Sequence, residues 1–224
     1  MAMLIYALII SVVLILIILT FTSRRLSPIP YFPSNRQDLP LIVKALKLKK
    51  NQVIFDLGAG DGIVIFAAAK EALQKKLNTK FIAVEINPIL IFILHLRRLF
   101  HSNKRNIKII RADIFKMNLR NASFWGAKRL QNRSQQRFRA SRNDASKLKP
   151  RQTWLTQFNN VTIYLYISPW FLEKVIENCK LKIENFSVVS YMYPIISLKQ
   201  KEKIIRGKNS IFIYDFQYFL QFVN

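Results

Sequence analysis

Residues 53–62, which read VIFDLGAGDG, constrain the fold of this chain more than any other segment. An apolar run rich in β-branched residues ends in Asp56, enters a glycine-rich turn and opens a stretch rich in alanine. Glycine lets a backbone turn tightly and approach a ligand closely, and an acid at the carboxyl end of a strand can accept hydrogen bonds from that ligand. The pattern predicts a strand, a ligand-binding turn and a helix in direct succession.

The spacing of the glycines indicates the kind of ligand. They fall at positions 58, 60 and 62, and Ile63 stands where a dinucleotide-binding G-x-G-x-x-G fingerprint needs its third glycine. Asp56 beside the turn would also repel a pyrophosphate. The turn therefore favours a cationic ligand, such as one that carries a sulfonium and an α-ammonium group.

The rest of the chain alternates short apolar strands with amphipathic helices. We expect strands at 53–56, 80–85, 107–111, 161–167 and 186–191, helices at 38–48, 62–77, 88–100 and 169–181, and a closing hairpin of 202–206 and 210–216. Asp38 is placed to cap the first of these helices. Such alternation predicts an α/β fold with a mostly parallel sheet covered on both faces, and with a C-terminal antiparallel hairpin.

The N-terminal segment predicts a membrane anchor. Of residues 1–21 only Ser11 and Thr20 are polar, and the run covers about 30 Å as a helix, the thickness of a hydrocarbon core. No basic residue precedes it, the first charge being Arg24, so it does not resemble a cleaved signal peptide. Because Arg24, Arg25 and further basic residues follow, we expect a single-pass protein with its C-terminal domain on the cytoplasmic, positive-inside face of a bacterial inner membrane or an equivalent membrane.

We divide the chain into an anchor (1–22), an extended linker rich in proline (23–37) and one domain (38–224) with a basic insertion at 120–151. The insertion has ten basic residues and one acid in a chain of net charge +24, and it has too few apolar residues to order itself. It is expected to be flexible and to attract anionic lipid.

Metal chemistry is not indicated. Cys179 is the only cysteine, and it falls within a helical pattern that predicts a buried thiol. His95 and His101, six positions apart, do not share one helix face as a pair of ligands would. The sequence predicts no metal site.

Three acids, each following one of the first three predicted strands, carry a resemblance to a known family. Asp56 with its glycine turn, Glu85 and Asp113 together resemble the cofactor motifs of class I S-adenosylmethionine-dependent methyltransferases. The resemblance implies a Rossmann-like fold, with Glu85 on the ribose diol and Asp113 near the adenine amino group of S-adenosyl-L-methionine. The other cofactor-binding residues that it implies at these strand ends are Gly58, Gly60, Asp61, Asn87 and Ile114.

The segment Pro30-Tyr31-Phe32-Pro33-Ser34 carries a closer resemblance. It is similar to the Pro-Tyr-x-Pro-Thr/Ser segment of single-span methyltransferases, which include bacterial proteins and mitochondrial protein-lysine N-methyltransferases that act on inner-membrane proteins. In that group the segment closes over the cofactor, which implies that Tyr31 and Ser34 lie near its methionine end. The insertion at 120–151 departs from the pattern.

The end of the fourth strand bears on the substrate. It reads LYISPW over residues 165–170, without the Asp/Asn-Pro-Pro-Tyr/Phe motif of enzymes that methylate nucleobase amines, and this argues against a nucleic-acid substrate. Tyr166, Ser168 and Trp170 are candidates for the catalytic wall of a lysine channel, although Tyr166 equally suits simple packing in the sheet. We expect methylation of a lysine in a membrane-associated protein. The alternatives are methylation of a lipid or quinone-type molecule, and a non-catalytic anchored protein that binds through the insertion.

Overall fold

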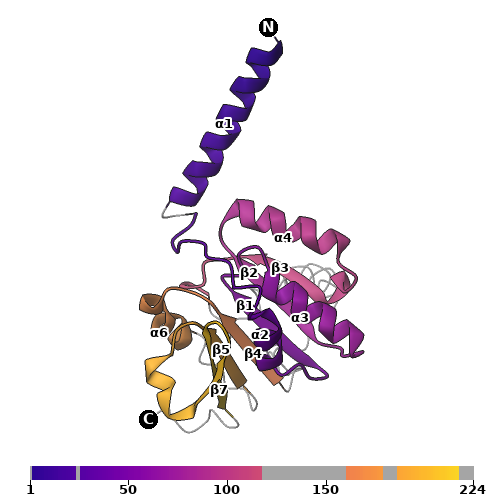
Figure 1. Cartoon of the computed structure of the whole chain (residues 1–224), viewed down its shortest axis with the longest axis vertical. Helices are drawn as coiled ribbons and strands as arrows, with labels where there is room; N and C mark the ends of the chain where they lie inside the picture. The colour runs from indigo at the N-terminus through magenta and orange to yellow at the C-terminus, as the bar shows by residue number, and fades with distance from the viewer. Residues whose placement is uncertain (1, 24–25, 118–159, 179–185, 217–224) are drawn as a thin grey trace, which may run out of the picture.

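A computed structural model describes residues 2–23, 26–117, 160–178 and 186–216, and it contains one seven-stranded sheet. The strands are β1 (Gln52–Leu57), β2 (Lys80–Glu85), β3 (Ile107–Arg111), β4 (Asn160–Leu165), β5 (Phe186–Tyr191), β6 (Glu202–Arg206) and β7 (Ser210–Phe216). Their order is β3-β2-β1-β4-β5-β7-β6. The first five strands of this order pair in parallel, whereas β7 pairs antiparallel with β5 and β6 (Figure 1). The predicted fold class, a mostly parallel sheet with a C-terminal hairpin, is confirmed.

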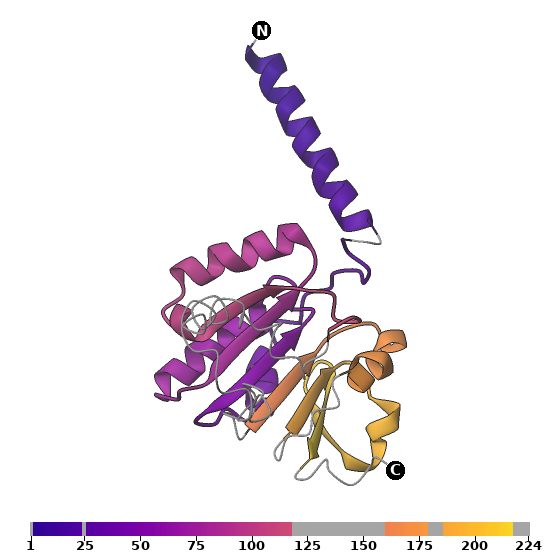
Figure 2. The same ribbon diagram turned by 180° about the vertical axis from the view of Figure 1, so that it is seen from behind.

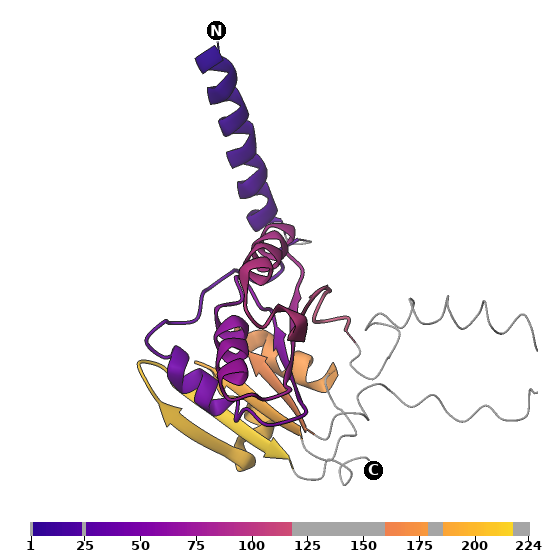
Figure 3. The same ribbon diagram turned by 90° about the vertical axis from the view of Figure 1, so that its right-hand side faces the viewer.

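Helices cover both faces of the sheet. The helices α2 (Leu39–Ala45), α3 (Ile63–Gln74) and α4 (Pro88–Phe100) lie on one face, and α6 (Pro169–Asn178) lies on the other (Figure 3). Two short 3-10 turns, η1 (Lys104–Asn106) and η4 (Ile196–Lys201), complete the described elements. Every residue of β1 is buried, because the central strand is covered on both faces. Its side chains alternate accordingly: Phe55 packs toward α6 and Ile54 toward α3.

The N-terminal helix α1 (Ala2–Thr22) projects away from the domain and none of its residues is buried (Figure 2). Its mean hydropathy reaches 3.2, and by length and composition it is the one helix among the described residues that is long and apolar enough to cross a membrane. The end of α1 lies against α4.

The structure corrects the first helix of the domain. Helix α2 ends at Ala45 rather than at residue 48, because Lys47 adopts a left-handed conformation with φ of 48°. Asp38 makes no capping hydrogen bond. Its buried carboxylate instead accepts hydrogen bonds from the Tyr191 hydroxyl (2.7 Å) and from the backbone N–H groups of Lys208 (2.6 Å) and Asn209 (2.9 Å). The two backbone donors belong to the turn between β6 and β7, and with Tyr191 of β5 they replace the helix N–H groups. Asp38 thereby ties the start of the domain to its last hairpin.

The predicted basic insertion at 120–151 lies outside the described residues. The boundaries proposed for anchor, linker and domain stay predictions. Strand β4 ends at Leu165, two residues before the predicted end, and Tyr166 therefore stands just beyond the sheet.

Candidate functional site

The glycine turn after β1 is held in a conformation that other residues rarely adopt. Gly58, Gly60 and Gly62 all have positive φ angles, of 81°, 58° and 78°. A Cβ atom on Gly60 would lie 2.6 Å from the ring of Tyr31, so that a side chain at this position would collide with the aromatic ring. Gly62 then begins α3 as its N-cap residue. The turn brings bare backbone to the carboxyl ends of the parallel strands, where ligands bind in open α/β sheets.

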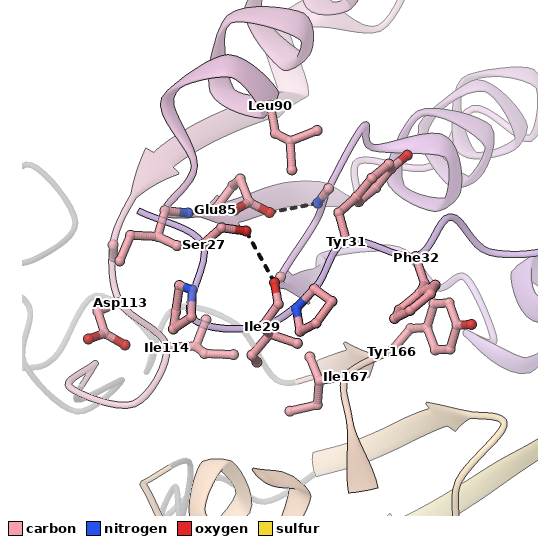
Figure 4. Close-up of a pocket in the computed structure, with 16 residues that line it drawn as sticks. Ser27, Ile29, Tyr31, Phe32, Glu85, Leu90, Asp113, Ile114, Tyr166 and Ile167 are labelled. Atoms are coloured by element: carbon pink, nitrogen blue, oxygen red, sulfur yellow. Dashed lines mark hydrogen bonds between the residues drawn. The ribbon is translucent and has the colours of Figure 1, made fainter. Parts of the chain in front are cut away.

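Glu85 at the end of β2 organises this turn. One carboxylate oxygen accepts a hydrogen bond from the Gly60 N–H (2.8 Å), and the other accepts from Ile86 (2.8 Å) and Asn87 (2.9 Å). The first of these bonds connects β2 to the glycine turn, and Figure 4 shows it as a dashed line. Glu85 is buried, so these charge-assisted hydrogen bonds are the main compensation for its lost hydration.

Asp56 is a buried acid that borders the glycine turn. It is only 3% exposed, and no hydrogen bond to its carboxyl group is made within the part of the chain that the structure describes. Burial raises the pKa of Asp56 to about 8, and the negative charges of Glu85 and Asp61 add to the effect. A buried, unpaired carboxyl beside a ligand-binding turn is the arrangement expected where a cationic group of a ligand completes the site.

Residues 27–34, which we call the strap, run across the strand ends toward α2. Tyr31 lies against the glycine turn, and burial together with the charge and hydrogen bonding of Asp61 raises its pKa to about 12. Asp61 in turn pairs with Arg97 of α4 at 2.8 Å. The Ser34 hydroxyl and the Tyr164 hydroxyl form a buried hydrogen bond of 2.9 Å. The strap is thereby fastened to β4 across 130 positions of sequence.

Two adjoining cavities lie beneath the strap. The larger, of about 60 Å³, is lined by strap residues and by Gly58, Gly60, Glu85, Leu90, Asp113, Ile114 and Tyr166 among others (Figure 4). The smaller, of about 20 Å³, is lined by Ser34, Asp56, Asp61, Tyr164 and Tyr166 among others. Gly58, Gly60, Tyr31, Phe32 and Tyr166 line both cavities, so the two form the halves of one site divided by aromatic side chains.

Ten of the thirteen predicted site residues come together in these cavities. They are Tyr31, Ser34, Asp56, Gly58, Gly60, Asp61, Glu85, Asp113, Ile114 and Tyr166. Their assignment to particular parts of a ligand stays a prediction, which the positions alone do not test.

The other three predicted residues line neither cavity. Asn87 is buried and caps α4, where its side-chain oxygen Oδ1 accepts hydrogen bonds from the backbone N–H groups of Ile89 (2.9 Å) and Leu90 (3.3 Å). Its side-chain amide nitrogen Nδ2 has no hydrogen-bond partner among the described residues. Ser168 accepts a backbone hydrogen bond from Phe171 at the start of α6, and the side chain of Trp170 on the same helix is 85% exposed.

Tyr164 and Phe32 are among the cavity-lining residues that sequence reasoning missed. Tyr164 stands beside Asp56 in the register of β1 and β4, and burial raises the pKa of its hydroxyl well above the usual value. The sequence could have indicated Tyr164, because it lies two positions before Tyr166 and side chains two apart share a face of a strand. Phe32, which Figure 4 places beside Tyr166, is 67% exposed and lines both cavities.

The bond between strap and β4 is open to a direct test. We expect Ser34→Ala and Tyr164→Phe each to lower the free energy of unfolding by about 1–2 kcal/mol, because each removes one hydroxyl and leaves the other buried without its partner. The double variant should cost little more than either single one, since both remove the same bond. Urea unfolding of the four proteins measures this. Strictly additive losses would mean that the two hydroxyls do not interact.

Comparison with known proteins relates this site to a class of enzyme. No family model matches the chain. The chain is 23% identical over 123 residues to the lysine N-methyltransferase of the ATP synthase C-subunit from Xenopus laevis, over 54% of this chain and 51% of that protein. It is 30% identical over 97 residues to the protein of the same name from Caenorhabditis elegans, over 41% of this chain and 48% of that protein. The chain thus spans about half the length of the curated relatives that it matches.

Solved structures support the fold independently. An RNA methyltransferase from Salinibacter ruber, crystallised with S-adenosyl-L-homocysteine, superposes with a TM-score of 0.55 over 86% of this chain and 97% of that protein, at 13% identity. The chain has the Rossmann-like fold of class I methyltransferases. Within that class, the sequence similarity is to protein-lysine N-methyltransferases, in agreement with the resemblance that the motifs carry.

Proposed function

We propose that this protein is an S-adenosylmethionine-dependent methyltransferase, held in a membrane by α1, that methylates a lysine of a membrane-associated protein. The observation that carries the proposal is Asp56, a buried acid without a hydrogen-bond partner among the described residues, next to a positive-φ glycine turn in a methyltransferase fold. The domain lies on the positive-inside face, because basic residues follow the span directly.

The residues present suit S-adenosyl-L-methionine. Asp56 offers a carboxylate to the α-ammonium group, while the bare backbone at Gly58 and Gly60 leaves room for close approach. One carboxylate oxygen of Glu85 accepts only the Gly60 N–H, so it can also accept from a ribose diol. Asp113 and Ile114 line the larger cavity, and we assign the adenine to their side of it. When bound, this cofactor supplies an electrophilic methyl group on a sulfonium.

Ligand entry requires the strap to shift. Cavities of about 60 and 20 Å³ are much smaller than the ~300 Å³ or more that small-molecule sites usually offer. We assign this movement to the strap from Ser27 to Phe32, because these residues line the larger cavity and precede the bond between Ser34 and Tyr164. In the proposed closed state, the strap excludes water from the cofactor and leaves Phe32 and Tyr166 as the aromatic border of the opening.

The chain's own residues contribute mainly alignment and desolvation. A lysine amine needs no protein base once it has lost its proton, so an aromatic channel that positions it supplies much of the rate. Tyr166 is suited to this wall: its hydroxyl donates to the Met192 sulfur (3.2 Å) and its ring packs edge-on against Tyr191, which holds it in place. Trp170 is exposed at the start of α6, where it is suited to contact a protein substrate before the lysine enters.

Competing functions find less support. Methylation of a lipid or quinone hydroxyl generally uses a general base. The two histidines line neither cavity: His95 is exposed on α4, and the His101 ring hydrogen-bonds with the Phe66 carbonyl. A non-catalytic scaffold would have no use for an unsatisfied Asp56, because a buried acid with a pKa of about 8 destabilises the fold.

The proposal is tested by methyl transfer to membranes. Full-length protein in lipid nanodiscs is incubated with methyl-labelled cofactor and with membranes from cells that lack its gene, and labelled species are identified by mass spectrometry. We expect label on lysine of a small integral membrane protein. The C-subunit of ATP synthase is the first one to examine, given the names of the relatives.

The rate should rise toward alkaline pH, as the substrate amine loses its proton. Label in extracted lipid or in RNA would overturn the substrate assignment and leave the methyltransferase assignment standing. Absence of both label and cofactor binding would overturn the enzyme itself.

A further inference from the structure

The outward face of α4 exposes four large apolar side chains next to His95. Phe92, Leu96, Leu99 and Phe100 are 68%, 47%, 59% and 80% exposed. Positions 92, 96 and 99 follow the spacing of one helix face. The inward face is already committed: Leu90 and Leu94 are buried, and Arg97 and Arg98 donate to Asp61 and to the Ile107 carbonyl. The four exposed apolar side chains of α4 therefore do not contribute to the core of the domain.

Helix α4 lies on the side of the domain from which α1 emerges. Helix α1 contacts α4, and Figures 1 and 3 both show α4 lying crosswise next to the end of α1, between α1 and the rest of the domain. If α1 crosses a bilayer, the surface of that bilayer meets the domain at α4. Lys104 and Arg105 are both exposed and add positive charge just after the C-terminal end of α4.

We propose that the apolar face of α4 docks into the surface of the bilayer that α1 spans, as an interfacial amphipathic helix with lipid as its partner. The inference rests on the anchoring part of the proposed function. Helices of this kind bury an apolar face at the boundary of headgroups and acyl chains, and basic residues beside them favour anionic lipid.

Docking through α4 would hold the site at a set height and tilt. Helix α4 begins directly after its cap Asn87, close to Glu85 at the end of β2, and its Leu90 lines the larger cavity. A flexible linker alone would let the domain swing about the end of α1. Two attachments, α1 and α4, restrict the strap and its cavity to one orientation toward the membrane surface, which suits a substrate lysine near the headgroups.

The test measures the depth of single positions in the full-length protein. In a Cys179→Ser background, Leu96→Cys, Leu14→Cys and Ile204→Cys each receive an environment-sensitive fluorophore, and the proteins are reconstituted in vesicles of equal parts phosphatidylcholine and phosphatidylglycerol. Ile204, on the edge strand β6, is the matched control, because it is 46% exposed against 47% for Leu96.

We expect blue-shifted emission at position 96 and quenching there by lipids spin-labelled near the headgroup. Position 14 should be quenched by lipids labelled deep in the acyl chain, and position 204 by neither. Quenching at 14 with none at 96 would refute the docking of α4 and leave the anchor intact, whereas no quenching at 14 would refute the anchor.

Two further outcomes count against the docking. Fluorescence at position 96 that depends on protein density and not on spin-labelled lipid would indicate a second copy on this face. Equal quenching at 96 and 204 would indicate nonspecific adsorption. As a supporting variant, Phe92→Ser/Leu99→Ser should weaken headgroup quenching at position 96 several-fold and leave quenching at position 14 unchanged.

Discussion

Replacing Asp56 by asparagine is expected to stabilise the ligand-free protein and at the same time to weaken cofactor binding. Burial, with Glu85 and Asp61 nearby, raises the pKa of this carboxyl from 3.8 to about 8, so the folded protein holds a proton that the unfolded chain releases at neutral pH. Asparagine has the same shape and carries no charge in either state. We expect Asp56→Asn to raise the free energy of unfolding at pH 7 by about 2–4 kcal/mol.

The pH dependence gives this prediction a second signature. Because the pKa of Asp56 is higher in the folded than in the unfolded state, its ionisation does not lower the free energy of unfolding below pH 4. It lowers that free energy progressively as the pH rises toward 8. Urea unfolding between pH 4 and pH 8 should therefore show the gap between wild type and Asp56→Asn widening with pH. A constant gap would mean that Asp56 does not carry a raised pKa.

Cofactor binding should respond in the opposite direction. Calorimetric titration with S-adenosyl-L-homocysteine should show at least about a tenfold loss of affinity in Asp56→Asn, as expected for a lost charged hydrogen bond. In the wild type, affinity should rise with pH up to about 8, because Asp56 must lose its proton to pair with an ammonium group. Asp215→Asn is the matched control: this acid pairs with Lys47 at the opposite ends of the strands, and its loss should leave affinity unchanged. Wild-type affinity in Asp56→Asn would contradict the cofactor assignment.

Glu85→Ala is expected to lower both stability and cofactor affinity. The substitution leaves the N–H groups of Gly60, Ile86 and Asn87 without their acceptor in a buried place. Unpaired buried donors cost about 1–3 kcal/mol each in the worst case, and partial hydration of the turn limits the total to about 2–4 kcal/mol. Loss of the ribose acceptor and of the turn's shape should together reduce cofactor affinity by roughly a hundredfold.

A pair of controls separates these effects. Glu71→Ala removes a carboxylate that pairs with Lys75 on the surface of α3, and it should change neither stability nor affinity measurably. Glu85→Gln keeps the size of the side chain and one acceptor oxygen, so it should retain more stability than Glu85→Ala while still losing affinity. If Glu85→Ala were as stable as wild type, the carboxylate would not organise the turn.

Much of the site follows from residues that stand at the ends of strands. Asp56, Glu85 and Asp113 follow apolar runs whose type and length predict strands, and parallel strands that end together bring their last residues to one edge. Prediction is weakest where a residue has two possible uses. From the sequence, Asn87 could equally contact a ligand or cap a helix. In the structure its side-chain oxygen caps α4.

Local pattern by itself determined the α/β class, the glycine turn, the three strand-end acids and the apolar helix of residues 2–22, because the period of apolar residues and the conformations open to glycine are properties of short segments. Only the tertiary structure decided that the strap crosses the strand ends, that Ser34 meets Tyr164, that Asp56 stays without a partner among the described residues, and that α4 lies against α1. The reason is physical: the partners lie far apart in the chain, and desolvation depends on every element that packs around a group. A carboxyl at the end of a strand has an ordinary pKa in water, and the fold that buries Asp56 is what raises it to about 8.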